Sequence, residues 1–181
     1  MRSLVVVESM FGNTRAVADA VADGLAAAGP VTVVTVGDAP SAPEEDVALL
    51  VVGAPTHAFS LSRPNTRRAA EEQGAEHSTT GLREWLATLP PAGSPDRSAA
   101  TFSTRIPKKF VPGSAAKAAA RRLSRLRYRL AAPPEDYFVL DTAGPLRAGE
   151  IARARAWGQR LAEAVNCRAE ASRGRTAEGD A

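Results

Sequence analysis

The sequence predicts an α/β fold, a doubly wound three-layer sandwich in which helices cover both faces of a five-stranded parallel sheet. Two observations predict it. Short β-branched runs alternate along the chain with longer segments of helical periodicity. The short runs are almost continuously apolar, which is typical of parallel strands buried on both faces. A length of 181 residues with 44% hydrophobic residues is enough for one domain with a sizeable core.

The first strand is expected at residues 3–7, a β-branched run that turn-forming residues follow. The first helix is expected over residues 13–28. Its apolar residues Val17, Val21 and Leu25 recur every four positions, and alanines surround them. The Gly-Pro pair at residues 29–30 should end this helix.

The next elements follow the same alternation. Residues 31–36 and 47–52 are expected to be the second and third strands, and residues 98–103 the fourth. A helix is expected at 82–89 between the third and fourth strands. The connection that precedes this helix, residues 56–80, is long for a compact domain, and we expect a short helix near 66–73 within it. Such a segment acts as a lid or partner surface, or is an insertion without a function of its own.

The C-terminal third begins with a basic amphipathic helix, expected over residues 114–130. Residues 137–140 are expected to be the fifth strand. The last helix is expected over 149–165, with Glu150 in its first turn, where the helix dipole favours an acid. We therefore expect a domain over 1–167 and a disordered C-terminal tail over 168–181, since that segment is polar and rich in small residues.

The composition indicates the cellular compartment in which the protein is expected. The only cysteine is Cys167, so no disulfide framework is possible, which fits a reducing cytoplasm. The N-terminus has no secretory pattern, and no apolar run approaches the length of a membrane span. The net charge is +3 and the pI about 9.5. We expect a cytoplasmic protein without a transmembrane segment.

The segment from Ser9 to Thr14 lies between the first strand and the first helix, where a ligand site is expected in this architecture. A helix N-terminus offers unpaired N–H groups to an anion. Ser9 and Thr14 add hydroxyl donors, Gly12 allows close backbone approach, and Asn13 tolerates turn geometry. A phosphate could be held here without lysine or metal, although a simply capped turn would have the same residues.

Other phosphate and catalytic motifs are missing. The loop has neither the Gly-Lys-Ser/Thr of a P-loop nor a G-x-G-x-x-G fingerprint. The third strand is followed by Gly-Ala-Pro at 53–55 instead of the aspartate of a response regulator. There is no G-x-S-x-G elbow, and Cys167 lies at an expected helix end without the loop that a cysteine phosphatase needs.

Residues 5–21 resemble the signature of the flavodoxin family. That signature has two aliphatic residues and an aromatic one, then spaced hydroxyl, small and aliphatic residues. The residues that fall on it are Ser9, Gly12, Thr14, Ala18 and Val21. One residue departs from it: Val7 stands where the family prefers Phe or Tyr, in the strand and outside the loop. The resemblance implies the sheet order 2-1-3-4-5.

The resemblance also implies that the chain binds FMN. We expect no metal site. The FMN phosphate would lie on Ser9, Met10, Phe11, Gly12, Asn13 and Thr14. The ring would lie between two loops, made of Pro55, Thr56, His57, Ala58 and Phe59 and of Ser103, Thr104 and Arg105. His57 or Phe59 could stack on the ring. His57 is also the candidate for a general acid or base, and a surface histidine with one local bond is its alternative. Phe59 could equally fill the core under its loop.

The charge pattern separates this chain from well-known flavodoxins, which are acidic around the flavin. Basic residues lie in or just after the two ring loops: Arg63, Arg67, Arg68, Arg105, Lys108 and Lys109. Positive charge near a flavin should raise its potential. The pattern favours a two-electron FMN-dependent oxidoreductase linked to a quinone or to NAD(P)H over a low-potential electron-transfer protein. The expected partner is a redox protein or a small-molecule electron acceptor.

The expected helix at 114–130 belongs to a wider stretch, 97–134, that contains no Asp or Glu. The simplest interpretation is a solvated cationic face without a binding function. The alternatives are an acidic electron-transfer partner, peripheral contact with an anionic membrane, and nucleic acid, which the scarcity of aromatic residues disfavours. A rival function remains: a non-enzymatic module that docks a partner with its anion pocket or basic helix. This second function would be favoured if the side chain of Phe59 or Met10 filled the slot expected for the ring.

Overall fold

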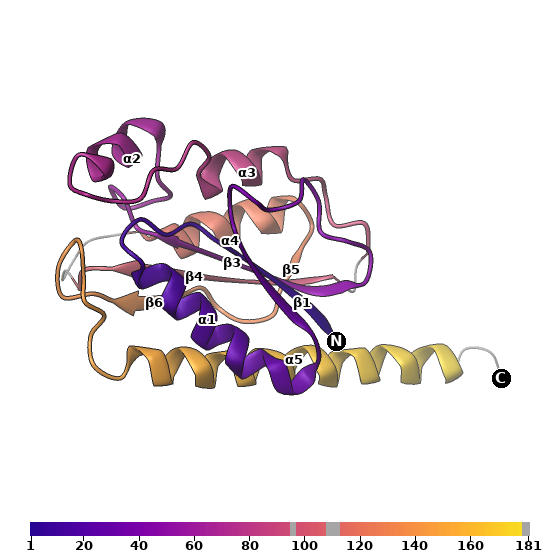
Figure 1. Cartoon of the computed structure of the whole chain (residues 1–181). Coiled ribbons are helices and arrows are strands. Elements are labelled where there is room, and N and C mark those ends of the chain that lie inside the picture. The colour runs from indigo at the N-terminus through magenta and orange to yellow at the C-terminus, as the bar shows by residue number, and fades with distance from the viewer. Residues whose placement is uncertain (95–96, 108–112, 179–181) are drawn as a thin grey trace.

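The chain folds into three layers around a parallel sheet (Figure 1). The computed structural model describes residues 1–94, 97–107 and 113–178. The strands are β1 Arg2–Val7, β2 Val31–Thr35, β3 Val47–Pro55, β4 Ser98–Arg105, β5 Arg129–Leu130 and β6 Glu135–Phe138. Their order is β2-β1-β3-β4-β5, with β6 also paired to β4, and every pair is parallel. The predicted fold class is confirmed.

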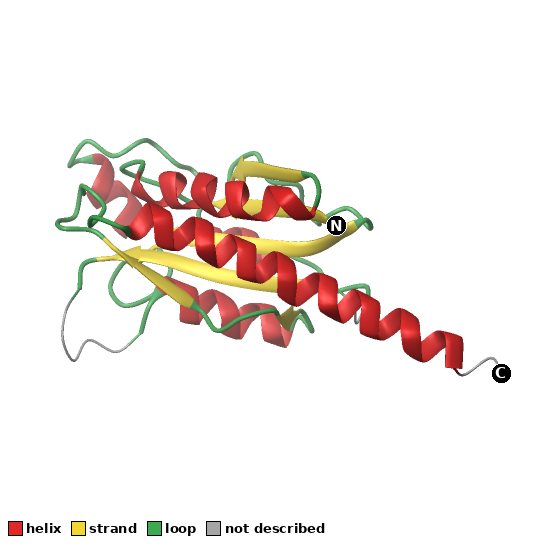
Figure 2. Ribbon diagram, turned by 90° about the horizontal axis from the view of Figure 1, so that it is seen from below, coloured by secondary structure: helices red, strands yellow, loops and turns green. Residues whose placement is uncertain are grey.

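Helices cover both faces of this sheet. The helices are α1 Asn13–Leu25, the short η1 Ala26–Ala28, α2 Pro64–Glu71, α3 Leu82–Thr88, α4 Ala115–Arg125 and α5 Glu150–Glu178. α3 and α4 lie on one face, and α1 and α5 lie side by side on the other (Figures 1 and 2). α2 stands beyond the end of the sheet, within the long connection where a short helix was expected.

Alternation along the strands divides the core in two. In β1, Leu4 and Val6 pack with α3 and α4, whereas Val5 and Val7 pack with α1 and α5. All four side chains are buried, since parallel strands between two helical layers have no solvent face. This explains the nearly continuous apolar runs in the sequence.

The edge of the sheet beyond β4 differs from the prediction. The helix expected over 114–130 ends at Arg125, and Arg129–Leu130 forms β5 instead. β5 pairs with the first residues of β4, and β6 pairs with the last. Pro133 and Pro134 lie between the two short strands. Proline has no N–H to donate to a strand ladder, so one continuous fifth strand is not possible here.

The contact between α1 and α5 depends on two glycines. A Cβ on Gly24 would lie 2.1 Å from the Arg155 carbonyl oxygen, and one on Gly158 would lie 2.3 Å from that of Val21. Backbone therefore meets backbone at this crossing, and no side chain can be inserted without separating the helices.

The last helix is longer than predicted. α5 continues through Glu178, across most of the segment expected to be a disordered tail, and extends past the sheet (Figure 2). Segment 168–178 is rich in Ala, Arg and Glu, all of high helix propensity, which continues the helix without an apolar stripe. Cys167 lies exposed on α5. None of the described helices is long and apolar enough to cross a membrane.

Candidate functional site

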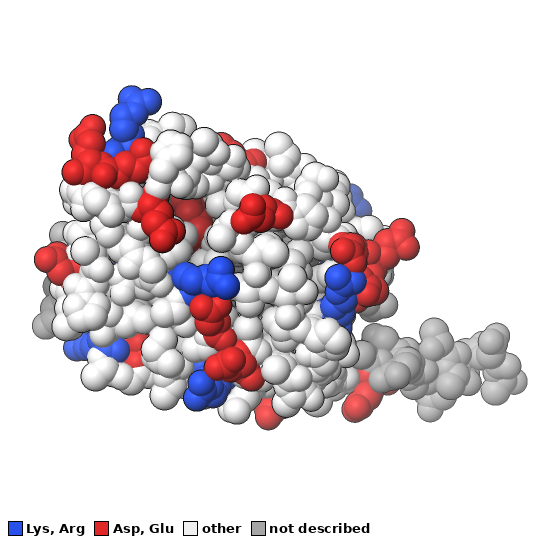
Figure 3. All heavy atoms as spheres, viewed as in Figure 1, with Lys and Arg blue, Asp and Glu red and all other residues white. Residues whose placement is uncertain are grey.

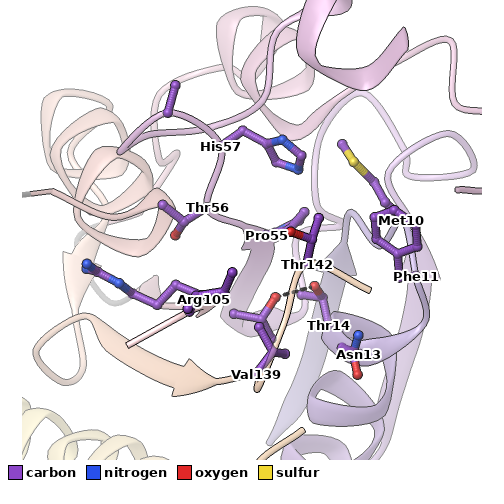
Figure 4. A pocket seen from close by; sticks show the side chains of 13 residues that line it. Met10, Phe11, Asn13, Thr14, Pro55, Thr56, His57, Arg105, Val139 and Thr142 are labelled. Atoms are coloured by element: carbon purple, nitrogen blue, oxygen red, sulfur yellow. Dashed lines mark hydrogen bonds between the residues drawn. The ribbon is translucent and has the colours of Figure 1, made fainter. Parts of the chain in front are cut away.

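A cleft of about 190 Å³ opens at the carboxyl ends of β1, β3, β4 and β6 (Figure 4). β3 and β4 are longer than predicted, so several expected loop residues are strand ends held by the sheet ladder. The residues that line the cleft are Met10, Phe11, Asn13, Thr14, Pro55, Thr56, His57, Ala58, Thr104, Arg105, Ile106, Val139 and Thr142. The structure thus brings residues from four connections to one place.

The first wall is the turn between β1 and α1. Gly12 is the N-cap residue of α1 and has a left-handed backbone with φ +79°, which glycine adopts without strain. The Arg15 N–H donates to Ser9 Oγ at 3.2 Å. The preceding N–H groups at a helix start have no intrahelical acceptor. The turn therefore presents backbone donors and the positive end of the α1 dipole to an anion.

The floor of the cleft is a pair of hydroxyls. Thr14 Oγ1 and Thr104 Oγ1 lie 2.8 Å apart in a hydrogen bond, drawn as the dashed line in Figure 4. Both side chains are buried. Only one of the two protons is used in this bond, so the other can be donated to a ligand.

The connection after β6 was not predicted to take part. Val139 and Thr142 line the cleft, and the Asn13 amide donates to the Ala143 carbonyl oxygen at 3.0 Å. Ile106, just after β4, was also missed. No local motif marks these residues. Only the position of their segments after neighbouring parallel strands could have indicated them.

The turn after β3 is tight and strained. His57 and Ser60 exchange backbone hydrogen bonds of 2.9 and 3.0 Å, and the two residues between them, Ala58 and Phe59, have φ of 45° and 67°. This conformation normally requires Asn-Gly. It directs Ala58 to the cleft and leaves the Phe59 side chain 58% exposed. Phe59 thus neither lines the cleft nor fills the core.

His57 reaches over the cleft toward Met10 (Figure 4). Burial lowers the pKa of His57, and the nearby positive charge of Arg67 lowers it further. The imidazole is therefore neutral at physiological pH, with one nitrogen to donate and one to accept.

The opposite wall carries a cation whose charge is partly balanced. Arg105 Nη1 lies 3.3 Å from Asp136 Oδ2 and donates to the Gly113 carbonyl oxygen at 2.9 Å. Ser103 is fully buried beneath this wall, where it accepts from Thr56 at 3.1 Å and donates to Asp136 at 2.6 Å. Ser103 therefore supports the cleft without lining it.

Most of the residues expected around the flavin do line this cleft. The exceptions are Ser103, Phe59, Ser9 and Gly12. Ser9 and Gly12 instead border a second cavity of about 420 Å³ on the other side of the same turn. Met10 forms one wall and does not fill the cleft, so the slot beside the turn is open.

The chain covers nearly the full length of several solved flavodoxins. A flavodoxin from the domain Archaea aligns over 92% of this chain and 99% of its own, at 18% identity and a TM-score of 0.63. Oxidised flavodoxin 1 from Bacillus cereus aligns over 90% and 98%, at 14% identity and a TM-score of 0.63. This chain has the flavodoxin-like fold.

The same fold occurs inside a larger protein. Rubredoxin oxygen:oxidoreductase from the anaerobe Desulfovibrio gigas aligns over 92% of this chain but 36% of its own, at 14% identity and a TM-score of 0.61. No family model and no curated sequence matches the chain. The flavodoxin-like fold is therefore shown by structure, at an identity too low for a close sequence match.

The donor set of this flavodoxin-like cleft fits FMN. None of the described residues that line it is Asp or Glu, and Thr14, Asn13 and Arg105 suit an anion. Met10, Phe11 and Pro55 offer apolar surface to a flat ring. At about 190 Å³ the cleft is below the ~300–1,000 Å³ of sites that enclose a drug-sized ligand. A ligand of flavin size would thus lie partly at the surface.

The expected excess of positive charge at the ring is smaller than the sequence indicated. Arg67 is buried, with its guanidinium bound to Ser62 and Glu84. Arg63 and Arg68 are exposed and do not line the cleft. Lys108 and Lys109 lie outside the described residues. Of the expected basic residues that the structure describes, Arg105 alone lines the cleft.

A buried polar cluster links the long connection after β3 to the turn between β1 and α1. Glu8, directly before that turn, accepts from Ser62 Oγ at 2.5 Å and from the Leu82 N–H at 2.7 Å. Arg67 donates to the same Ser62 oxygen at 3.1 Å. Burial raises the pKa of Glu8, while these donors and the charge of Arg67 oppose the increase. The cluster fixes the start of α2 and α3 beside the cleft.

Glu8→Gln should change the pH dependence of stability. Because the folded pKa is raised, the stability that Glu8 contributes is complete below its unfolded pKa, about 4.3, and is lost as pH rises through the folded pKa. Glutamine does not titrate. We therefore expect the unfolding free energy of Glu8→Gln, relative to wild type, to increase as pH rises from acid toward neutral. Urea unfolding across this range measures it.

The exposed Glu45→Gln is the matched control and should show no such trend. A constant difference between Glu8→Gln and wild type across this range would show that the carboxyl does not titrate with a raised pKa.

Proposed function

We propose that this chain binds FMN in the cleft and acts as an oxidoreductase that passes electrons between a reductant and an acceptor. One observation carries the proposal. Asn13 and Thr14, at the start of α1, line one open cleft together with the amphipathic slot between residues 56–58 and 104–106. Their place on a flavodoxin-like sheet supports FMN as the ligand that needs both halves.

Each half has a distinct part. The N–H groups at the start of α1, with Asn13 and one proton of the Thr14–Thr104 pair, would hold the phosphate. Backbone groups after β3 and β4, with Met10 and Phe11, would hold and orient the ring. Neutral His57 can donate a hydrogen bond there or hold a proton near the ring edge.

FMN, when bound, supplies the capacity to accept and donate one or two electrons. Arg105 lines the cleft, and none of the described lining residues is a carboxylate. This charge pattern would stabilise negative charge on a bound ring. This supports a two-electron reaction with a quinone or NAD(P)H as the finer form of the proposal. Asp136 weakens the effect, since it balances part of the Arg105 charge.

The test is a visible absorption spectrum of the purified protein, with FMN added if it is colourless. We expect flavin bands that stay with the protein through gel filtration. Riboflavin, which lacks the phosphate, is the matched control and should be retained much less. Reductive titration of the same sample then gives the number of electrons taken up and the potential. A colourless protein that ignores FMN would refute the proposed function and leave the fold intact.

A further inference from the structure

α4 and the edge of the sheet enclose a groove of about 350 Å³ whose charged residues are all cations. We call it the cationic groove. The residues that line it are Lys117, Ala120, Arg121, Ser124, Arg125, Leu130 and Pro134. Lys117, Arg121 and Arg125 follow one another at four-residue steps, so they share one face of the helix. All three are exposed.

Within the described part of the chain, no intramolecular partner explains these cations. Over the described residues no ion pair is found for Lys117, Arg121 or Arg125, and the stretch 97–134 contains no acid that could provide one nearby. By contrast, Arg122 on the same helix donates to the Leu86 and Ala87 carbonyl oxygens at the end of α3. The face seen in Figure 3 also differs, because acidic and basic side chains lie next to one another there.

This arrangement is unfavourable in the free protein. Like charges at four-residue spacing destabilise a helix by about 0.2–0.5 kcal/mol per pair. Lys117 also lies in the first turn of α4, near the positive end of the helix dipole, where a cation is disfavoured. An anionic surface placed against the groove would reverse both effects.

α4, whose cations line the groove, begins beside the cleft. The Ala115 N–H, in the first turn of α4, donates to Thr56 Oγ1 at 3.1 Å. A Cβ on Gly113 would lie 2.6 Å from the Phe59 carbonyl oxygen, so the strained turn that carries exposed Phe59 touches Gly113, two residues before α4. A partner seated on the groove would therefore reach the rim of the cleft.

The chemistry of the surface favours a protein over a membrane or a nucleic acid. The apolar residues of α4, such as Ala119 and Leu123, are buried in the core and cannot enter a bilayer. Tyr128 is also buried, so the described groove offers no aromatic face for base stacking. Arginine and phenylalanine side chains are both enriched in protein interfaces.

We propose that the cationic groove and Phe59 form the docking surface for an acidic redox protein that exchanges electrons with the cleft. The assignment of electron exchange rests on the proposed function, whereas docking itself does not. Opposite charges would steer the encounter and make association depend on ionic strength.

The experiment uses an acidic plant-type ferredoxin as the probe and measures its affinity for the full chain. We expect binding that weakens at least about tenfold between about 50 mM and about 200 mM salt. The variant Lys117→Glu/Arg121→Glu/Arg125→Glu should bind at least about tenfold more weakly than wild type at low salt. The matched control Arg155→Glu/Arg160→Glu/Arg168→Glu makes the same charge change on exposed residues of α5, across the sheet. It should bind ferredoxin more tightly than the groove variant does.

Two further measurements keep the outcomes separate. A milder variant, Lys117→Gln/Arg121→Gln/Arg125→Gln, should lose part of the affinity while circular dichroism shows an intact fold. Flavin bands are recorded for wild type and for every variant, so a wild-type protein that docks ferredoxin but holds no flavin would refute the electron exchange alone.

Three results would overturn the docking proposal. One is no ferredoxin binding by wild type. Another is equal weakening by the groove variant and the α5 control. The third is tighter groove-dependent binding to phosphatidylserine vesicles or to an oligothymidylate than to ferredoxin, which would assign the groove to a membrane or a nucleic acid.

Discussion

Replacing Gly12 with valine should weaken the binding of FMN at least about thirtyfold. At φ +79° a β-branched residue is strained by roughly 1–2 kcal/mol, and relief of that strain would rotate the donors of the turn away from the phosphate. No atom lies within 4 Å of a Cβ built on Gly12, so the effect would come from backbone geometry and not from a clash. Fluorescence titration of the apoprotein with FMN measures it.

Gly74→Val is the matched control. Gly74 has φ +89° and equally open surroundings, but it lies outside the turn between β1 and α1 in which Gly12 is the N-cap residue. The control should lose stability to a similar extent but retain its FMN affinity. Equal affinity in wild type and both variants would remove the turn from the phosphate site.

Gly24→Ala should lower the free energy of unfolding by about 2–3 kcal/mol, although alanine is the better helix former by about 1 kcal/mol. The added methyl group would lie 2.1 Å from the Arg155 carbonyl oxygen, and backbone cannot move aside as a flexible side chain can. α1 and α5 would have to separate along their contact. Urea unfolding measures the change, and Gly158→Ala should behave in the same way.

Asp23→Ala provides the comparison for this prediction. Asp23 is the neighbouring residue and forms only an exposed ion pair with Arg155, so its loss should cost less than about 1 kcal/mol. A Gly24→Ala protein that is more stable than wild type would mean that the helices are not in backbone contact.

The parts of the fold that could be predicted depend on local patterns. Strands buried on both faces are visible as apolar runs, and the turn from Ser9 to Thr14 combines a strand end, a glycine and a helix start within a few residues. The strand order was implied by the resemblance to flavodoxins. The loops after the third and fourth strands were therefore expected to supply the remaining cleft residues. The sheet geometry itself explains why loops after neighbouring strands meet.

The parts that could not be predicted depend on contacts distant in sequence. Arg67 looks like a surface cation in the sequence, but its burial depends on Ser62, on Glu84 and on Glu8, far earlier in the chain. Val139 and Thr142 have no motif, and only the packing of their loop against Asn13 brings them to the cleft. Pro133 and Pro134 were visible, but their effect depends on which strand would lie beside them.

The long α5 helix carries one exposed thiol far from the cleft. Cys167 is the only cysteine of the chain and is exposed. It lies about 25 Å along the helix axis from Glu150, away from the end of the sheet where the cleft opens. A thiol-directed link to a gold electrode or to a fluorophore would therefore attach every molecule in one orientation, with the cleft facing solution. Voltammetry on such a film would record electron exchange by the protein, and the attachment at Cys167 would not block access of a partner to the cleft.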